Sequence, residues 1–495
     1  MTATNSYATP PANGRQGPFA IPTDLLIGSD WRAAASGKRI DILDPSTEQV
    51  LTSVADASVE EGIAAVDAAA TAAAAWAATP PRKRAEILQA CFHAMMAEQE
   101  WLAQLISLEN GKAISDARGE VAYAAEFFRW YGEEAVRING DLAISPSGAN
   151  RIVVQYQPIG IALLITPWNF PAAMATRKIA PALAAGCTCI LKPAEETPLT
   201  ALAVAEIMRR AGVPDGVVNV INTSEPGPVC SAILHDPRVR KLSFTGSTEV
   251  GRILLHEAAD SVISSSMELG GNAPFLILDD ADLDQAIEGA MIAKMRNAGE
   301  ACTAANRFYV QRGIHDSFVA KLVERMGAMK VGPGVDGATQ CGAMINRQAI
   351  EKIESLVEDA LAKGAEARLG CKTPAGAGFF YPPSVIANVQ PGSEILKTEV
   401  FGPVAAVIPF DDPEEAIALA NATEYGLAAY VYTENLKKGL QIAERIECGM
   451  VAVNRGLVSD AAAPFGGVKQ SGLGREGGHH GLLDYCEAKY IAVSW

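Results

Sequence analysis

The chain has 495 residues, more than one hydrophobic core usually serves, so we expect at least two packed units. Its 57 Asp and Glu residues outnumber its 41 Lys and Arg, and the net charge of −16 argues against a surface for nucleic acid or anionic membranes. Apolar runs such as 159–165 are far shorter than the roughly 20 residues that cross a bilayer, so we expect no membrane span.

Nine cysteines and six histidines are scattered along the chain. They form neither a framework of paired cysteine spacings nor a metal-ligand pattern. We therefore expect a reducing, cytoplasmic setting, free thiols and no bound metal.

Residues 1–21 are polar and rich in Pro, Gly, Ser and Thr, which predicts a flexible tail without a secretory signal. Apolar residues at helical intervals then predict two packed helices, over 58–78 and 82–104. A strand over 151–157 follows, and a β-branched run over 159–166 predicts a second strand that is buried on both faces.

From here strands and helices alternate, a pattern typical of a parallel sheet covered by helices. The expected strands span 187–192, 216–221 and 239–244, and the expected helices begin at Pro198, near Pro228 and at Thr248.

A second α/β unit is predicted to begin with a buried strand over 273–278. It continues through strands at 307–310, 405–409 and 450–454. The last segment, 488–495, predicts a strand that pairs either outside its own domain or as an ordinary edge strand.

Cys302 lies in a run of small residues, Asn297-Ala-Gly-Glu-Ala-Cys302-Thr. Small neighbours leave room for a substrate carbon to approach the sulfur, and a nearby backbone amide could hold an oxyanion. Upstream, Glu268 could supply a carboxylate base. Together they indicate chemistry at a carbonyl, although a buried structural cysteine is the alternative for Cys302 taken alone.

The segment Ser243-Phe-Thr-Gly246-Ser247-Thr-Glu-Val-Gly251 closes a strand and opens a helix, where backbone amides and the helix dipole favour a phosphate. It matches neither the dinucleotide fingerprint nor a Walker loop. An ordinary tight turn is therefore the alternative.

Lys192-Pro-Ala-Glu195 follows an expected strand, at the end where α/β sheets bind ligands. Glu195 could accept hydrogen bonds from ribose hydroxyls and would repel a 2′-phosphate, which favours NAD over NADP. An exposed charge at a helix cap is the alternative. In Pro167-Trp-Asn169-Phe-Pro, the Asn169 amide could stabilise an oxyanion, or the segment could be only a turn.

Taken together, these segments resemble the aldehyde dehydrogenase superfamily from about residue 22 to the C-terminus. Seven motifs occur in order: Pro167-Trp-Asn169-Phe-Pro, Lys192-Pro-Ala-Glu195, Phe244-Thr-Gly-Ser-Thr-Glu-Val-Gly251, Glu268-Leu-Gly-Gly-Asn272, Cys302, Glu399-Val-Phe-Gly-Pro403, and Pro464-Phe-Gly-Gly-Val-Lys-Gln-Ser-Gly472.

The resemblance implies that Cys302 attacks the aldehyde, that Asn169 and the Cys302 amide hold its oxygen, and that hydride passes to a nicotinamide. Glu268 would then activate water against the thioester, and Lys178 matches a family lysine near the nicotinamide. Since acyl transfer to coenzyme A needs no such base, Glu268 favours hydrolysis to the free acid.

NAD is the preferred cofactor on this reading, with NADP as the alternative. The implied cofactor-binding residues are Thr166, Pro167, Trp168, Lys192, Glu195, Gly246, Ser247, Gly270, Glu399 and Phe401.

Within the superfamily, the closer resemblance is to the succinate semialdehyde dehydrogenases. Arg177, Arg296 and Ser459 coincide with positions that bind a distal carboxylate, and two guanidinium groups with a hydroxyl suit that group. Structural ion pairs are the alternative for the arginines. Arg455, at a place where relatives can carry an acid, leaves glutarate semialdehyde or a broad aliphatic range open. A catalytically silent binding protein is a remote alternative.

The resemblance implies an α/β fold with a Rossmann-type cofactor domain over 22–143 and 164–270, and a second α/β catalytic domain over 271–463. A small β oligomerisation segment with bridging parts would combine 144–163 and 464–495. A homodimer or homotetramer follows from that segment.

Overall fold

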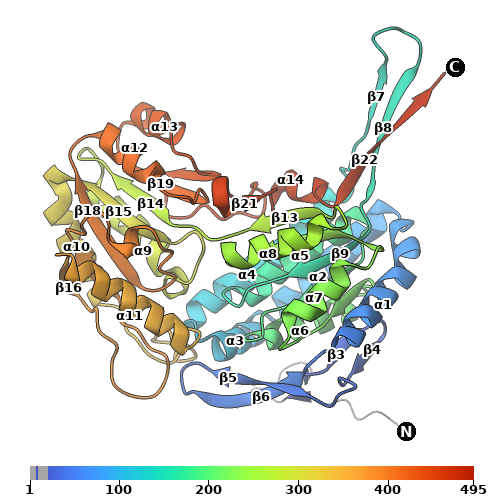
Figure 1. Ribbon diagram of the computed structural model, residues 1–495, viewed down its shortest axis with the longest axis horizontal. Coiled ribbons are helices and arrows are strands. Elements are labelled where there is room, and N and C mark those ends of the chain that lie inside the picture. The colour runs from blue at the N-terminus through green and yellow to red at the C-terminus, as the bar shows by residue number, and fades with distance from the viewer. Residues whose placement is uncertain (1–6, 9–19, 495) are drawn as a thin grey trace.

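The computed structural model describes residues 7–8 and 20–494 (Figure 1). Most of the expected N-terminal tail therefore lies outside the described residues. Within it, β1 (Tyr7–Ala8) pairs antiparallel with β2 (Ile21–Pro22). No helix in this described part of the chain is long and apolar enough to cross a membrane.

The first large sheet has eight strands, and its five central strands are parallel. This confirms the predicted α/β class, while the antiparallel edges at β3 and β21 were not predicted. In sheet order the strands are β21 (Gly472–Leu473), β13 (Ser264–Glu268), β12 (Val239–Thr245), β9 (Ile161–Ile165), β10 (Cys189–Lys192), β11 (Val218–Val220), β3 (Leu25–Ile27) and β4 (Asp30–Arg32).

Helices cover both faces of this sheet. Alternate residues of the fully buried strand β9 enter different cores, with Leu163 in one cluster and Leu164 in the other. The cluster around Leu163 includes α1 (Val59–Ala77), α7 (Pro226–Leu234) and α8 (Thr248–Ala259). The cluster around Leu164 includes α2 (Pro81–Ala97), α3 (Gln99–Asn110), α4 (Ile114–Glu134), α5 (Pro171–Ala185) and α6 (Pro198–Arg210).

One helix prediction was wrong, because the expected helix over 82–104 is two helices. Glu98 has φ −103° and ψ 16°, so it ends α2 and precedes α3. No Gly or Pro marks this break, and the apolar residues keep a helical spacing on both sides of it. The sequence pattern therefore predicts one continuous helix.

The second large sheet has seven strands around a separate hydrophobic cluster. In order they are β16 (Glu366–Leu369), β17 (Ser384–Ala387), β18 (Val404–Phe410), β15 (Ala305–Gln311), β14 (Ala273–Ile277), β19 (Ala428–Tyr432) and β20 (Met450–Val453). Its helices are α9 (Leu283–Met295), α10 (His315–Gly327), α11 (Arg347–Ala362), α12 (Pro413–Asn421) and α13 (Leu436–Ala443).

A three-stranded arm projects from the body beside the short helix α14 (Gly478–Leu483) (Figure 1). It consists of β7 (Asp141–Ile144), β8 (Arg151–Pro158) and β22 (Cys486–Val493). The expected C-terminal strand is thus present, and it pairs antiparallel along the whole of β8. A separate hairpin joins β5 (Arg39–Asp44) to β6 (Gln49–Ala55).

Candidate active site

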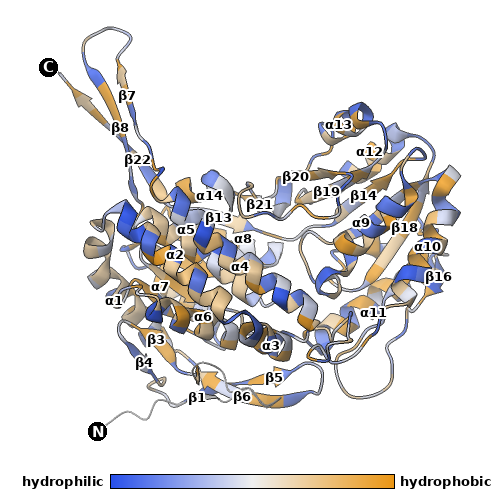
Figure 2. Cartoon of the chain, turned by 180° about the vertical axis from the view of Figure 1, so that it is seen from behind, coloured by the Kyte–Doolittle hydropathy of each residue, from blue (hydrophilic) through white to orange (hydrophobic). Residues whose placement is uncertain are grey.

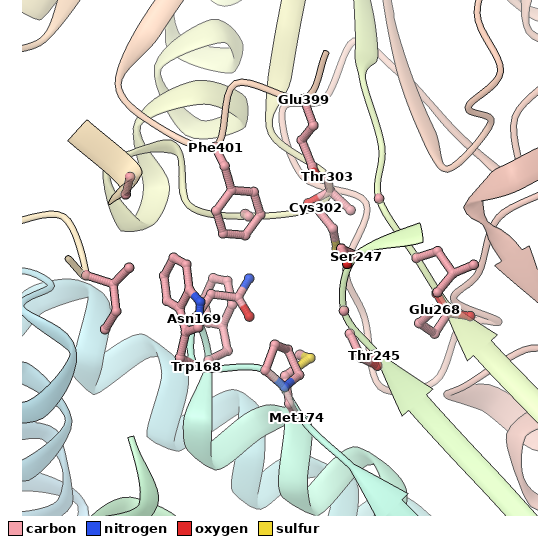
Figure 3. A pocket seen from close by; sticks show the side chains of 18 of the residues that line it. Trp168, Asn169, Met174, Thr245, Ser247, Glu268, Cys302, Thr303, Glu399 and Phe401 are labelled. Carbon is pink, nitrogen blue, oxygen red and sulfur yellow. The ribbon is translucent and has the colours of Figure 1, made fainter. Parts of the chain in front are cut away.

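A cavity of about 470 Å³ opens where β9, β12 and β13 of the first sheet end, and loops of the second unit close its other side. Ligands bind α/β sheets at these carboxyl ends. Figure 3 shows the side chains converging from three directions: Trp168 and Asn169, then Thr245, Ser247 and Glu268, and opposite them Cys302, Glu399 and Phe401.

Most of the residues singled out in the sequence line this cavity. They are Pro167, Trp168, Asn169, Arg177, Gly246, Ser247, Glu268, Gly270, Arg296, Cys302, Glu399, Phe401 and Ser459. The structure places four others outside the lining: Thr166, Lys178, Lys192 and Glu195.

The turn before Cys302 has a strained backbone. Asn297, Ala298 and Gly299 have φ values of 52°, 50° and 79°, the left-handed region that side chains other than Gly avoid. A Cβ on Gly299 would lie 2.3 Å from the Gly402 carbonyl oxygen, so only Gly fits there. The Asn297 side chain donates to the carbonyls of Asn169 (2.9 Å) and Glu300 (3.0 Å), which fixes the turn against the first unit.

Cys302 is partly exposed to the cavity, and its backbone N–H donates to no acceptor within the described ranges. Gly271 lies so close that a Cβ there would be 2.6 Å from the Cys302 carbonyl oxygen. Burial raises the pKa of the thiol to about 12; Arg177 acts in the opposite direction, whereas Glu399 and Glu268 raise it further. The resting side chain is therefore a thiol that must give up a proton to react.

Glu268 ends β13 with a buried carboxyl whose two oxygens have no hydrogen-bond partner in the described chain. Burial raises its pKa well above the usual value, and the charge of Glu476 adds to this, while Arg177 and Lys178 oppose it. A carboxyl whose pKa is raised in this way is, once ionised, a stronger base than an exposed carboxylate.

Asn169 is held in place by Lys112, two residues before α4, and by Glu120 on that helix. Its carbonyl accepts from Lys112 Nζ at 2.6 Å, and Lys112 forms a fully buried ion pair with Glu120, also at 2.6 Å. Glu120 in turn accepts from Ala172 N (2.8 Å) at the start of α5. The Asn169 side-chain nitrogen donates to Glu300 O (3.1 Å), which leaves its second N–H for an oxyanion.

Glu476 is a buried carboxylate that the sequence did not reveal. Its Oε2 lies 2.5 Å from Arg177 Nε, and its Oε1 accepts from Lys178, which also donates to Ser243 Oγ at 2.9 Å. Burial acts to raise the pKa of Glu476, but Lys178 and Arg177 hold it below its usual value. The only sequence signal was an acid in the run Gly472-Leu-Gly-Arg-Glu476.

On the opposite side of the cavity, Glu399 accepts from Gly271 N at 3.2 Å. Burial raises its pKa to about 7, although Lys352 acts to lower it. Lys352 lines the cavity and was not anticipated. The rings of Trp168 and Phe401 meet edge to face with centroids 5.3 Å apart, so they form an apolar wall beside this carboxyl.

A dinucleotide fits the first unit at two points. Ser247 caps α8, where its Oγ accepts from Val250 N at 3.3 Å, and this 12-residue helix begins at the cavity edge, which suits a phosphate. Lys192 Nζ lies 2.6 Å from Glu195 Oε1 at the end of β10. Glu196, next to that pair, lines the cavity.

The two cavity arginines differ in their partners. Arg177 contacts Glu476 and lies 4.3 Å from the centre of the Phe465 ring. Arg296 lies over the Phe170 ring at 5.2 Å but forms no ion pair or hydrogen bond with the residues the structure describes. Arg296 is therefore a cation at the cavity that forms no ion pair with the described residues, although its charge acts to lower the pKa of the buried Asp116.

A sequence profile of the aldehyde dehydrogenase family matches residues 31–491. The chain belongs to this family. As an aldehyde dehydrogenase, the protein is an oxidoreductase that oxidises an aldehyde with NAD or NADP. Within residues 7–8 and 20–494, no group of three or more His, Cys, Asp or Glu side chains is arranged to hold a metal ion.

The chain is similar over nearly its whole length to curated members of this family. It is 53% identical to the succinate-semialdehyde dehydrogenase of Paenarthrobacter nicotinovorans, covering 90% of this chain and 99% of that one. It is 47% identical to succinate-semialdehyde dehydrogenase [NADP(+)] GabD of Escherichia coli (94% and 97% covered) and 46% identical to a glutarate-semialdehyde dehydrogenase of Pseudomonas aeruginosa (94% and 96%).

The fold is likewise that of the family. The crystal structure of a succinate-semialdehyde dehydrogenase from Burkholderia pseudomallei matches with a TM-score of 0.95 and 45% identity, over 96% of this chain and 98% of that chain.

The raised pKa of Cys302 determines how the alkylation rate of the cofactor-free enzyme should depend on pH. Because only the thiolate is nucleophilic and the pKa is about 12, alkylation of Cys302 by iodoacetamide should accelerate about tenfold per pH unit from about pH 7 to 10. Peptide mass spectrometry of timed reactions measures this rate. A plateau below about pH 9 would contradict the buried-thiol assignment.

Glu268→Gln should separate the two halves of the reaction. Without the carboxylate, a single burst of NADH or NADPH is expected, followed by turnover reduced about 100-fold or more, since the thioester lacks its base. Stopped-flow absorbance measures the burst and the steady rate. Steady turnover at the wild-type rate would remove Glu268 from the hydrolytic step.

Proposed function

We propose that this aldehyde dehydrogenase oxidises a short aldehyde with a distal carboxylate, succinate semialdehyde first, to the free acid. The observation that carries this proposal is Arg296, a cavity cation that forms no ion pair or hydrogen bond with the described residues. A carboxylate forms strong, paired hydrogen bonds with a guanidinium, whereas an alkyl tail would leave the charge desolvated. Ser459 in the same lining supplies a hydroxyl, and the semialdehyde dehydrogenases among the relatives support the same substrate class.

In the proposed first half-reaction, the Cys302 sulfur bonds to the aldehyde carbon and the thiol proton is lost to Glu268, directly or through water. The carbonyl oxygen becomes an oxyanion held by the Asn169 amide and the Cys302 N–H. A nicotinamide cofactor, held by residues such as Ser247 and Glu399, would supply the hydride acceptor, and loss of hydride from that carbon would leave Cys302 as a thioester.

Glu268 must first release the thiol proton to solvent; in the second half-reaction the ionised carboxylate takes a proton from a water molecule, whose oxygen attacks the thioester carbon. The carbon–sulfur bond breaks, the acid leaves and the sulfur regains a proton. The unpartnered, buried carboxyl of Glu268 supports this role, because nothing else in the described chain occupies its lone pairs.

Glutarate semialdehyde is the second candidate substrate, since one relative carries that name. It adds one methylene between the aldehyde and the carboxylate, a difference worth only about 1–3 kcal/mol in a pocket. Arg455 does not line the cavity; it is exposed and donates to Leu457 O at 2.9 Å. Arg455 therefore does not determine whether the longer substrate fits. The distance between Cys302 and Arg296 sets the length of substrate that can contact both residues.

For the cofactor we propose a preference for NAD over NADP. The Glu195 carboxylate beside Lys192 supports it, because a 2′-phosphate would meet a negative charge and a lysine that is already paired. The Escherichia coli relative named for NADP shows that the family includes the opposite choice.

We further propose the domain division 22–143 with 164–270 for the cofactor, 271–463 for catalysis, and 144–163 with 464–495 for oligomerisation and bridging. The separate cores of the two sheets support the first two units. Leu142 and Ile144 on β7 and Tyr490 on β22 are 70%, 61% and 58% exposed, and Figure 2 shows hydrophobic colour along the arm. Burial of these residues against a second copy supports a homodimer or homotetramer.

The cofactor preference predicts the behaviour of Glu195→Gln. Loss of the negative charge should raise kcat/KM for NADP about tenfold and change that for NAD by less, so the NAD/NADP ratio falls. Initial rates with each cofactor at saturating aldehyde give the ratio. An unchanged ratio would reject the role assigned to Glu195.

The substrate proposal predicts that wild-type kcat/KM for succinate semialdehyde exceeds that for butanal about 100-fold or more, since butanal lacks the distal charge. Arg296→Ala should lose about 2–4 kcal/mol of this discrimination, mainly on the charged substrate. Arg445→Ala, which removes an exposed pair with Glu414, is the matched control. Equal wild-type values for both aldehydes would reject the carboxylate while leaving the family assignment intact.

A further inference from the structure

Tyr123 on α4 lines the cavity together with Arg177 and Arg296. Its hydroxyl is shielded from solvent, and its O–H proton meets no acceptor in the described part of the chain, although the Arg177 guanidinium lies near its oxygen. A buried hydroxyl without a partner is destabilising, because it has lost its hydrogen bonds to water. The Tyr123 hydroxyl therefore does not stabilise the fold of the free protein. It gains a hydrogen bond only when a bound ligand supplies the acceptor.

The packing of the Tyr123 ring does not explain the hydroxyl. The ring meets Phe127, one turn further along α4, edge to face at 4.8 Å and 63°. A phenylalanine ring at position 123 would make the same contact, since the hydroxyl takes no part in it. The oxygen atom is thus left for a polar function.

The surroundings of the hydroxyl are positively charged. Burial raises the pKa of Tyr123, while Arg177 and Arg296 both act to lower it, so both guanidinium groups are close enough to interact with the oxygen. Arg177 is already engaged by Glu476 and by the Met174 sulfur at 3.2 Å. An anion drawn in by Arg296 would therefore arrive beside a hydroxyl with an unused proton.

We propose that Tyr123 is a specificity-determining residue whose O–H donates to the distal carboxylate of the substrate held by Arg296. A phenolic oxygen can at the same time accept from Arg177, so one hydroxyl joins the paired arginine to the bound carboxylate. The inference rests on the proposed function and adds a neutral donor to Arg296 and Ser459.

The position of Tyr123 on α4 suits this role. The helix is anchored one turn earlier by Glu120, which pairs with Lys112 and caps α5. The same rigid helix therefore supports the Asn169 backbone and presents the Tyr123 hydroxyl. We expect this to fix the distance between the reacting carbonyl and the carboxylate, which favours one chain length of substrate.

The test is Tyr123→Phe, assayed with succinate semialdehyde and with butanal. Since the ring packing is kept, kcat/KM for the semialdehyde should fall roughly 10- to 100-fold, chiefly through KM, while butanal changes less than about twofold. Tyr381→Phe is the matched control, because Tyr381 also has a buried, unpartnered hydroxyl but does not line the cavity. It should leave both substrates unchanged.

Succinate provides a second readout that does not depend on turnover. As a competitive inhibitor it should bind the Tyr123→Phe enzyme more weakly by about the same factor, which a merely structural role would not produce. Equal losses on both aldehydes, or an unchanged inhibition constant, would overturn the inference. If wild type shows no preference over butanal, the proposed function fails; if wild type does and Tyr123→Phe keeps it, only the role of Tyr123 fails.

Discussion

The contact on which the site depends is the hydrogen bond from the Asn297 side chain to the Asn169 carbonyl (2.9 Å). It joins the loop after β9 in the first unit to the left-handed turn that carries Cys302. The same carbonyl accepts from Lys112, whose buried pair with Glu120 would cost about 3–5 kcal/mol to break on one side. The oxyanion donor and the nucleophile are therefore fixed relative to each other before any ligand binds.

Two buried carboxyl groups close to this contact have opposite properties. Glu268 has no hydrogen-bond partner and a raised pKa, whereas Glu476 contacts Arg177 and Lys178 and has a lowered one. The charge of Glu476 also acts to raise the pKa of Glu268. Carboxyl groups whose pKa values are separated in this way can take different tasks, with Glu476 remaining ionised while Glu268 exchanges protons.

The sequence predicted the parts of the molecule that local pattern determines. The β-branched run of β9, the strand-to-helix turn at Ser247 and the small-residue run at Cys302 all occupy the places expected of them. The two-residue strand β21 and the break at Glu98 carry no local signal and were missed.

Glu476 and Tyr123 were missed for a related reason. The importance of each residue arises from groups distant in the chain, Arg177 and Lys178 for the first and Arg177 with Arg296 for the second. Hydrophobic periodicity and motif spacing describe neighbours along the chain, so they do not indicate which charges meet across an interior.

The two cavity arginines show the difference between what the sequence predicts and what only the structure reveals. From the sequence, Arg177 and Arg296 were predicted to share one role, with structural ion pairs as the alternative, and the structure separates them. Arg177 already forms an ion pair with Glu476, which Lys178 shares, so a second carboxylate gains less Coulomb energy there than beside an unpaired guanidinium. Arg296 forms no ion pair with the described residues, and a neutral aldehyde that expels water from around it would leave a desolvated cation. The preference for an aldehyde with a distal carboxylate over a neutral aldehyde therefore depends mainly on Arg296. The positive charge of Arg177 adds to the electrostatic potential around it.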